Sequence, residues 1–321
     1  MKWLPASALL LSFGGWNAHS ATCPPLSNTH RVALAEAFRI ERLLGDSVWP
    51  GFSQVPFIVL LVSGESEYLI NHPSPPAEFA ALDHSTALGT VMCRPRQFAP
   101  DLLATFPAVG GKSTVVVGTP EATRTSPTAW VITLLHEHFH QLQNSQPSYY
   151  AAVDSLGLSG GDRTGMWMLN YPFPYDSAPV IAAFDRVAAA TRAALDGGRS
   201  SLAGYETARA ALRSALSTAD ERYLELQLWQ EGIARYTEYQ VALLASSRYA
   251  PAPEFTRLTG YRPFREVADS LKSGIMSGVL RPNLREHHRV SFYSLGAAIG
   301  LLLDTDEPMW RSRYFARPFV M

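Results

Sequence analysis

Hydrophobic residues recur with two different spacings along the chain, and the spacing changes near residue 120. Before that point, short apolar runs with many β-branched residues alternate with Gly, Pro and Ser, a pattern typical of strands joined by turns. It predicts strands at residues 57–62, 67–71, 90–93 and 113–117, and one helix over residues 32–44 that ends at Gly45.

After residue 125 the apolar positions follow helical spacing almost throughout. Ser126 followed by Pro127 is typical of an N-cap and a first helical residue, so we expect a helix that runs to about Asn144. Further helices are predicted at residues 178–195, 201–216, 218–246 and 290–303, the third of them opened by a capping box of Thr218 and Glu221.

A small mixed sheet followed by a helical lobe predicts an α+β fold with a cleft between the two lobes. We expect residues 1–20 to be a signal peptide, residues 21–125 a sheet-containing lobe, and residues 126–321 a helical lobe. The two lobes together would form one catalytic domain, with its site in the cleft.

Composition narrows the class of protein. The chain has 321 residues, of which 47% are hydrophobic and 17% charged, which is typical of a globular protein and not of a disordered one. Its 27 basic residues nearly balance its 28 acidic ones, so no strong field favours nucleic acid. Beyond the N-terminal segment, no apolar run is long enough to predict a membrane span. The sequence does not indicate an oligomeric state.

The N-terminal segment is typical of a secretory signal peptide. Lys2 precedes a short apolar stretch over residues 4–16, and Ala18-His19-Ser20 places small residues where a signal peptidase cleaves, near Ser20 or Ala21. We therefore expect an exported protein, periplasmic or secreted. A buried N-terminal helix is the alternative, and the Pro and Gly residues of the segment disfavour it.

The chain has two cysteines, Cys23 and Cys93. In an oxidising compartment they are natural partners for a disulfide, and two buried thiols are the alternative. Residues 20–22 fit a lipoprotein cleavage site poorly, so we expect a soluble exported protein rather than one anchored through Cys23.

The motif with most chemical content is His136-Glu137-His138-Phe139-His140, an H-E-x-x-H sequence on the helix predicted from Ser126. Because His136 and His140 are four positions apart, they project from one helix face and can ligate one Zn²⁺, while Glu137 reaches the attacking water. His138 points the other way and is expected to be packed or exposed. A chance match on a helix is the alternative.

The third ligand has to come from elsewhere, because the metzincin pattern would place a glycine and a histidine at Gln143 and Gln146. The segment Trp229-Gln-Glu231-Gly-Ile-Ala-Arg-Tyr-Thr-Glu238 lies in the predicted long helix. Together with H-E-x-x-H it resembles the gluzincin metallopeptidases of clan MA, especially the catalytic lobe of aminopeptidase-N-like enzymes. The resemblance implies that Glu231 is the third zinc ligand. A glycine inside a helix, as at position 232, usually marks the close approach of another backbone.

A second match concerns the helix near the C-terminus. Residues 293–303, from Tyr293 to Leu303, resemble the helix of the same enzymes whose tyrosine binds the oxyanion, so the resemblance implies that role for Tyr293. An ordinary core tyrosine is the alternative. His287 and His288, just upstream, are substrate-binding or surface residues.

Two departures limit what the resemblance implies. Glu231 follows His140 by 91 positions, which is longer than in that group, and no Gly-x-Met-Glu-Asn motif for a substrate amino group is present. Glu121, which follows the strand at residues 115–117, is weak evidence for binding of a substrate amino group.

The metal motif and the resemblance together predict a zinc-dependent exported hydrolase. It would cleave peptide bonds of a peptide or protein substrate, with Glu137 as general base. A strand at residues 115–117 would hold the peptide.

Two alternatives remain open at this stage. One is a non-catalytic exported zinc protein, which a fourth protein ligand such as Glu238 or Asp154 would favour. The other is a zinc hydrolase that acts on non-peptide amides or esters.

Overall fold

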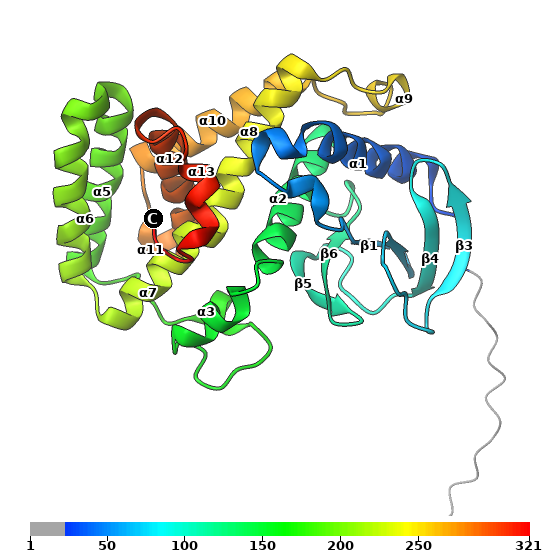
Figure 1. The fold of residues 1–321 in the computed structure, drawn as a ribbon, viewed down its shortest axis with the longest axis horizontal. Helices are drawn as coiled ribbons and strands as arrows, with labels where there is room; N and C mark the ends of the chain where they lie inside the picture. Colours follow the sequence, from blue (N-terminus) through cyan, green and yellow to red (C-terminus); the bar gives the residue numbers. More distant parts are fainter. Residues whose placement is uncertain (1–22) are drawn as a thin grey trace, which may run out of the picture.

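The computed structural model describes residues 23–321, apart from the side chains of residues 199 and 200. The predicted signal peptide at residues 1–20 lies outside the described residues. Figure 1 shows a sheet beside a larger helical part, with α1 and α2 between them. This arrangement confirms the predicted α+β class.

The sheet has six strands in the order β3-β4-β2-β1-β6-β5. Only β1 and β6 pair in parallel among the strands described, and every other neighbouring pair is antiparallel. The strands are β1 Val59–Ser63, β2 Ser66–Ile70, β3 Ala80–Ser85, β4 Gly89–Pro95, β5 Leu103–Val109 and β6 Lys112–Gly118. All four predicted strands are therefore present, and β1 and β2 form an antiparallel hairpin.

Two strands were not predicted, and both lie at sheet edges. β5 contains Pro107 and has a register irregularity after Phe106, features that an edge strand tolerates and a central strand does not. β3 is mostly exposed, so it lacks an apolar run. The expectation that residues 115–117 form a substrate-pairing edge is wrong, because β6 is hydrogen-bonded on one side to β1 and on the other to β5.

The helices make up most of the remaining chain. The α-helices are α1 Asn28–Val48, α2 Pro127–Asn144, α3 Tyr149–Ser155, α4 Trp167–Asn170, α5 Ala178–Gly197, α6 Leu202–Ala215, α7 Thr218–Gln227, α8 Ile233–Arg248, α9 Pro253–Thr256, α10 Phe264–Leu280, α11 Leu284–His287, α12 Val290–Asp306 and α13 Trp310–Arg313. Three short 3₁₀ turns are η1 Phe52–Gln54, η2 Gly198–Ser201 and η4 Tyr314–Ala316, and η3 Leu228–Gly232 is a π-helical turn.

Several helix boundaries differ from the predictions, and the predicted helix over residues 218–246 is interrupted by η3. The first helix starts earlier, because Ser27 accepts a hydrogen bond from the His30 backbone, and it passes through Gly45, which packs on the Phe52 side chain. The predicted capping box of Thr218 and Glu221 is wrong by one position, since Ser217 is the N-cap and accepts from the Asp220 backbone.

Residues of both lobes share one continuous core. Alternate side chains of the strands, such as Val59, Leu61 and Val115, face α1 and α2 and join the core of the helical lobe. The opposite face of the sheet carries a smaller apolar cluster that includes Leu60 and Val116. α2 therefore packs against the sheet and against α8 at once.

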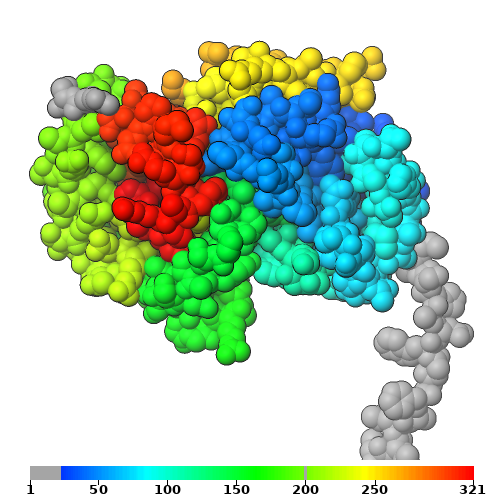
Figure 2. All heavy atoms as spheres, viewed as in Figure 1, coloured from blue at the N-terminus to red at the C-terminus, as the bar shows by residue number. Residues whose placement is uncertain are grey.

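The C-terminal segment covers the surface between the two parts of the molecule, as the red spheres in Figure 2 show. Arg311 donates to the Val48 carbonyl at the end of α1. Arg209 of α6 donates to the Met321 carbonyl, so the segment is fixed to both parts.

Cys23 and Cys93 form a disulfide, which confirms the predicted pairing and ties residue 23 to β4. Within residues 23–321, no helix is both long and apolar enough to cross a membrane.

Candidate metal centre

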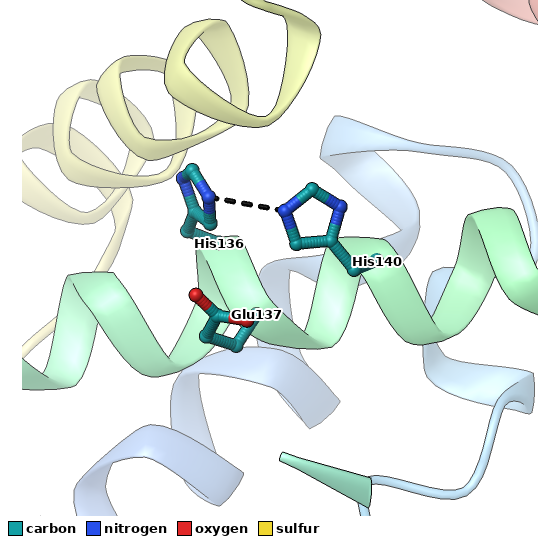
Figure 3. Close-up of side chains that lie close together, drawn as sticks. All are labelled: His136, Glu137 and His140. Carbon is teal, nitrogen blue, oxygen red and sulfur yellow. Dashed lines mark hydrogen bonds between the residues drawn. The ribbon is translucent and has the colours of Figure 1, made fainter. Parts of the chain in front are cut away.

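α2 presents the two histidines of the H-E-x-x-H motif. Ser126 accepts a hydrogen bond from the Ala129 backbone and Pro127 occupies the first turn, which fixes the start of the helix as predicted. His136 and His140 then lie one turn apart on the same face, with their Nε2 atoms 3.2 Å apart (Figure 3). Glu137 completes a group whose potential ligand atoms all lie within 4.8 Å of one another.

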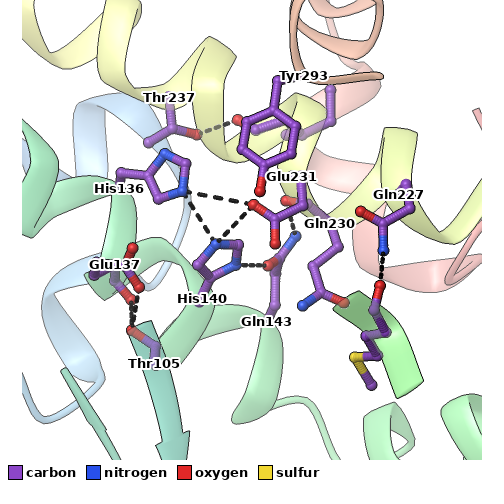
Figure 4. Close-up of polar contacts among 12 residues, drawn as sticks. Thr105, His136, Glu137, His140, Gln143, Gln227, Gln230, Glu231, Thr237 and Tyr293 are labelled. Atoms are coloured by element: carbon purple, nitrogen blue, oxygen red, sulfur yellow. Dashed lines mark hydrogen bonds and ion pairs between the residues drawn. The ribbon is translucent and has the colours of Figure 1, made fainter. Parts of the chain in front are cut away.

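Glu231 faces the histidine pair from the π-helical turn between α7 and α8 (Figure 4). Its Oε2 lies 3.7 Å from His140 Nε2 and 3.9 Å from His136 Nε2. The three residues selected from sequence are thus brought together, although 91 positions separate Glu231 from His140.

A contact between two glycines fixes the position of the π-helical turn. A Cβ atom on Gly232 would lie 2.5 Å from the Cα of Gly296, and one on Gly296 would lie 2.6 Å from the Cα of Gly232. Only glycine at both positions lets the backbones of the turn and of α12 touch, as the glycine at position 232 indicated. The turn is thereby held against the helix that carries Tyr293.

Gln143 connects the π-helical turn to the histidines. Its Nε2 carries two hydrogens and lies within hydrogen-bonding distance of three acceptors: the Trp229 carbonyl at 3.2 Å, the Gln230 carbonyl at 3.3 Å and the Tyr314 hydroxyl at 2.9 Å. Tyr314 in turn donates to the Trp229 carbonyl. These two side chains therefore bind carbonyls of the π-helical turn from outside the helix.

The partners of the outer ring nitrogens set the tautomers of both histidines. Because the Gln143 amide nitrogen donates to the carbonyls of the turn, its Oε1, 2.7 Å from His140 Nδ1, accepts a hydrogen bond from that ring nitrogen. His136 Nδ1 lies 2.7 Å from Glu238 Oε1 and has no other polar partner among the described residues. With both Nδ1 atoms occupied in this way, the two Nε2 atoms are the ones that could ligate a metal, since neutral rings would present both lone pairs to the same point.

In the absence of a metal, a proton shared by the histidines balances the negative charge of Glu231. Burial alone would lower the pKa of His140, but its hydrogen bond and charge interaction with Glu231 outweigh burial and raise the pKa to about 9. Burial favours a higher pKa for Glu231, yet the two histidines and Tyr293 lower it to about 2. Glu238 also has a lowered pKa, because Arg235 and His136 outweigh its burial.

This donor set fits one tetrahedral Zn²⁺. Zinc–ligand distances of about 2.0–2.1 Å in a tetrahedron place neighbouring ligand atoms about 3.3 Å apart. The three separations here, 3.2, 3.7 and 3.9 Å, require only small side-chain movements to reach that value. Two imidazoles and one carboxylate are also ligands that zinc accepts.

Glu137 is turned away from the Glu231 side of the pair and is bound to the sheet. Its Oε2 lies 2.7 Å from the Oγ1 of Thr105 in β5, and the same hydroxyl lies 2.9 Å from the Glu137 carbonyl (Figure 4). Glu137 is the only member of the motif that contacts β5 through its side chain among the contacts described. Thr105 was not identified from sequence, because β5 itself was not.

Tyr293 lies on the opposite side of Glu231, and Arg289 accompanies it. The Tyr293 hydroxyl is hydrogen-bonded to Glu231, and Arg289 donates to the same hydroxyl at 2.7 Å. Burial, followed by the charge of Glu231, raises the pKa of Tyr293 well above its usual value, so the phenol keeps its proton. Arg289 was missed, although its spacing of four residues from Tyr293 is that of one helix face.

Other residues considered from sequence lie elsewhere. His138 is fully buried between the rings of Phe52 and Phe57. His287 and His288 are exposed, and His288 stacks on Tyr175.

The two acids considered as a fourth zinc ligand do not approach the Nε2 atoms. Glu238 faces the outer nitrogen of His136, and Asp154 is exposed on α3. Neither takes a position between the two Nε2 atoms and Glu231.

Little of the candidate metal centre is exposed to solvent. His136 and His140 are each 6% exposed, and the side chains of Glu231 and Arg289 are 14% and 25% exposed. The centre predicted to lie in a cleft between the lobes is thus largely buried. A groove of about 800 Å³ lies beside α1, the η1 loop and the ends of β2 and β4.

No protein-family model matches the chain, and no curated protein or solved structure is similar enough to count as a match.

Proposed function

We propose that this protein is an exported zinc-dependent metallopeptidase. The observation that carries the proposal is the convergence of His136 Nε2, His140 Nε2 and the Glu231 carboxylate, with Glu137 adjacent but turned toward β5. Three protein ligands, with one further carboxylate beside them that is not a ligand, are the arrangement of a catalytic zinc site, in which the fourth position takes water or substrate.

The chemistry follows from the residues around that point. Bound Zn²⁺ supplies a Lewis acid that polarises the substrate carbonyl and lowers the pKa of the attacking water. Glu137 accepts the proton of that water and later delivers it to the leaving amine. Tyr293 keeps its proton and can donate it in a hydrogen bond to the developing oxyanion, while Arg289 orients the hydroxyl.

An extended peptide has a surface to pair with beside this point. β5 is the outermost strand of the sheet, and Thr105 of that strand contacts Glu137 directly. A peptide that added to the free edge of β5 would run past the general base, and main-chain hydrogen bonds would hold it independently of its sequence. This supports a peptide or protein substrate rather than a small amide or ester.

Two alternatives predict different properties. A non-catalytic zinc protein fills its fourth position with a protein ligand; the orientation of Glu238 toward the outer nitrogen of His136 argues against that. A hydrolase of non-peptide amides or esters would use the same metal chemistry, but its substrate would not pair with the edge of β5.

The test combines metal analysis with a peptide-library digest of the protein lacking residues 1–20. We expect one zinc per chain and cleavage of library peptides, which a chelator abolishes and added zinc restores. His140→Ala should lose the zinc, whereas Glu137→Gln should keep it and lose turnover by about 10²–10⁴-fold.

Each other outcome decides between the alternatives. Zinc retained by His140→Ala would overturn the ligand set. Stoichiometric zinc without cleavage of peptides, amides or esters would identify a non-catalytic zinc protein. Cleavage of esters alone would identify the non-peptide hydrolase.

A further inference from the structure

The outer edge of β5 carries a large apolar side chain that the fold leaves exposed. Leu103 is 41% exposed, and among the six strands described it is the only large apolar residue that is exposed. Its partner Val117 of β6 is buried in the main core, yet Leu103 itself belongs to neither apolar cluster of the described residues. An exposed apolar residue on an edge strand favours pairing with another chain.

The two edges of the sheet differ in charge. β3, at the other edge, contains Asp83, which is paired with Arg31 of α1. Residues 103–109 of β5 contain no charged side chain. Charged residues on an edge strand discourage the addition of a further strand. The edge of β5 is therefore the one suited to receive an extended peptide.

The backbone groups of Leu103 and Thr105 point to this outer edge. Val115, the β6 partner of Thr105, donates its amide hydrogen at 3.0 Å to the Ile58 carbonyl, just before β1. Val115 thus faces β1 rather than β5, and in an antiparallel pair its partner Thr105 then faces away from β6. The same holds for Leu103, two residues earlier. Pro107 has no N–H to donate, so the edge can pair regularly only before it.

α2 runs alongside β5 in the same direction. Near the start of α2, Trp130 Nε1 donates to the Gly118 carbonyl at the end of β6, at 2.8 Å. Near its end, Gln141 Nε2 donates to the Ser113 carbonyl at the beginning of β6, also at 2.8 Å. α2 is therefore antiparallel to β6. Since β5 is also antiparallel to β6, α2 and β5 run the same way.

Leu103 consequently lies one step along the edge from the proposed general base. Leu103 and Thr105 are two residues apart, so their side chains share the face of the sheet that α2 covers, about 7 Å apart. Thr105 contacts Glu137, and one helical turn (~6 Å) before Glu137 the residue is Thr133. Between residues 130 and 143 of α2, only Thr133 is not buried, so the surface between it and Leu103 is accessible to a ligand.

We propose that the edge of β5 selects peptides that carry a large apolar side chain at the position opposite Leu103, two residues from the position opposite Thr105. This selectivity rests on the proposed peptidase function and names the class of peptide that the site accepts. Directly opposite side chains of paired strands have Cβ atoms about 4.5–5.5 Å apart, so the contact removes apolar surface of both from water. Main-chain hydrogen bonds hold any sequence, and Leu103 supplies the preference that they lack.

The experiment is a digest of a peptide library by the zinc-loaded protein, with the products sequenced and aligned at the cleaved bond. The parent should favour Leu, Ile, Met or Phe over Lys and Glu at one position close to that bond, by at least about tenfold. Leu103→Lys should lose this preference and favour Glu at the same position, and Leu103→Glu should favour Lys there. Leu280→Lys, which changes an exposed leucine of α10, is the matched control and should cleave as the parent does.

Zinc per chain should be equal in all four proteins, because Leu103 is not a proposed ligand. Cleavage by the parent without a preference at any one position would overturn the apolar subsite and leave the peptidase standing. So would a parental preference that persists in both Leu103 variants. If the parent cleaves no peptide, the proposed function fails and the selectivity fails with it.

Discussion

The hydroxyl of Thr105 lies within hydrogen-bonding distance of two oxygens of Glu137, 2.7 Å from the carboxylate and 2.9 Å from the backbone carbonyl. Both oxygens are acceptors, and a hydroxyl has a single hydrogen to donate. The outermost strand of the sheet thus holds the proposed general base at one fixed position. This contact couples the edge on which a peptide would pair to the residue that would cleave it.

Thr105→Val should lower the rate of peptide cleavage by about 10–100-fold, the value of a hydrogen bond to a charged group. Thr105→Ser keeps the hydroxyl and should recover most of the rate. Zinc content should be the same in all three proteins, since Thr105 is not a proposed ligand. Single-turnover rates and metal analysis make the comparison, and a Val variant as fast as the parent would remove the positioning role.

Tyr293→Phe removes only the hydroxyl that contacts Glu231 and Arg289. If that hydroxyl binds the oxyanion, kcat should fall by about 10²–10³-fold with little change in zinc content. Arg289→Gln should have a smaller effect on kcat, because it leaves the phenol in place. Equal kcat for Tyr293→Phe and the parent would assign the oxyanion to another donor, and Arg289 would be the next candidate.

Gln143→Ala should weaken zinc binding by about 10–100-fold, because the orientation of the His140 ring and the carbonyls of the π-helical turn depend on this amide. Gln146→Ala is the matched control, since the hydrogen bond described for the Gln146 side chain is to the Leu142 carbonyl near the end of α2 and not to the centre. Zinc affinity measured against a competing chelator gives the answer. If both variants bind zinc equally well, Gln143 does not position the His140 ring for the metal.

Gly232→Ala should destabilise the protein by about 1–3 kcal/mol, because its Cβ has no space against Gly296. It should also weaken zinc binding by moving Glu231 away from the histidines. Gly274→Ala in α10 is the control, since nothing lies within 4 Å of its added Cβ. Denaturant unfolding and zinc titration of both variants test this; a Gly232→Ala protein of parental stability would mean that the contact relaxes freely.

Zinc affinity should rise with pH up to about 9, the pKa of His140 in the metal-free protein, because zinc has to displace that proton. The expected slope is about tenfold per pH unit below that value. The metal-free protein should show the opposite trend. Since the folded pKa lies above the usual 6.5, stability from this proton is complete below pH 6.5 and is lost as pH rises through about 9. Zinc titrations and chemical denaturation across this range check both signs.

The sequence indicated the parts of the site that depend on local spacing. His136 and His140 follow from one helical turn, and the glycine at position 232 correctly indicated a close backbone contact. Tyr293 was selected because its helix resembles that of the gluzincins, and in the structure it lies beside Glu231. The helix around Glu231 was predicted to be regular, whereas its π-helical turn depends on Gly296 and Tyr314, which are distant in sequence.

What could not be predicted depends on contacts between distant segments. Thr105 becomes relevant only because β5, an irregular strand with an internal proline, pairs at the edge of the sheet. The role of Glu238 is to contact the outer nitrogen of His136, and the direction of its side chain cannot be inferred from its position on a helix. Strand exposure and side-chain direction are set by packing, which a single sequence does not display.

Two glutamines two positions apart on α2 have contacts in different parts of the molecule. Gln141 donates to the carbonyls of Ile58 and Ser113 in the sheet lobe, and Gln143 donates to those of Trp229 and Gln230 in the helical lobe. If either lobe unfolded alone, the side-chain amide of Gln141 or of Gln143 would lose its hydrogen-bond acceptors. The two lobes therefore form a single cooperative unit, and heating should give one calorimetric transition in which the sheet and the helices unfold together.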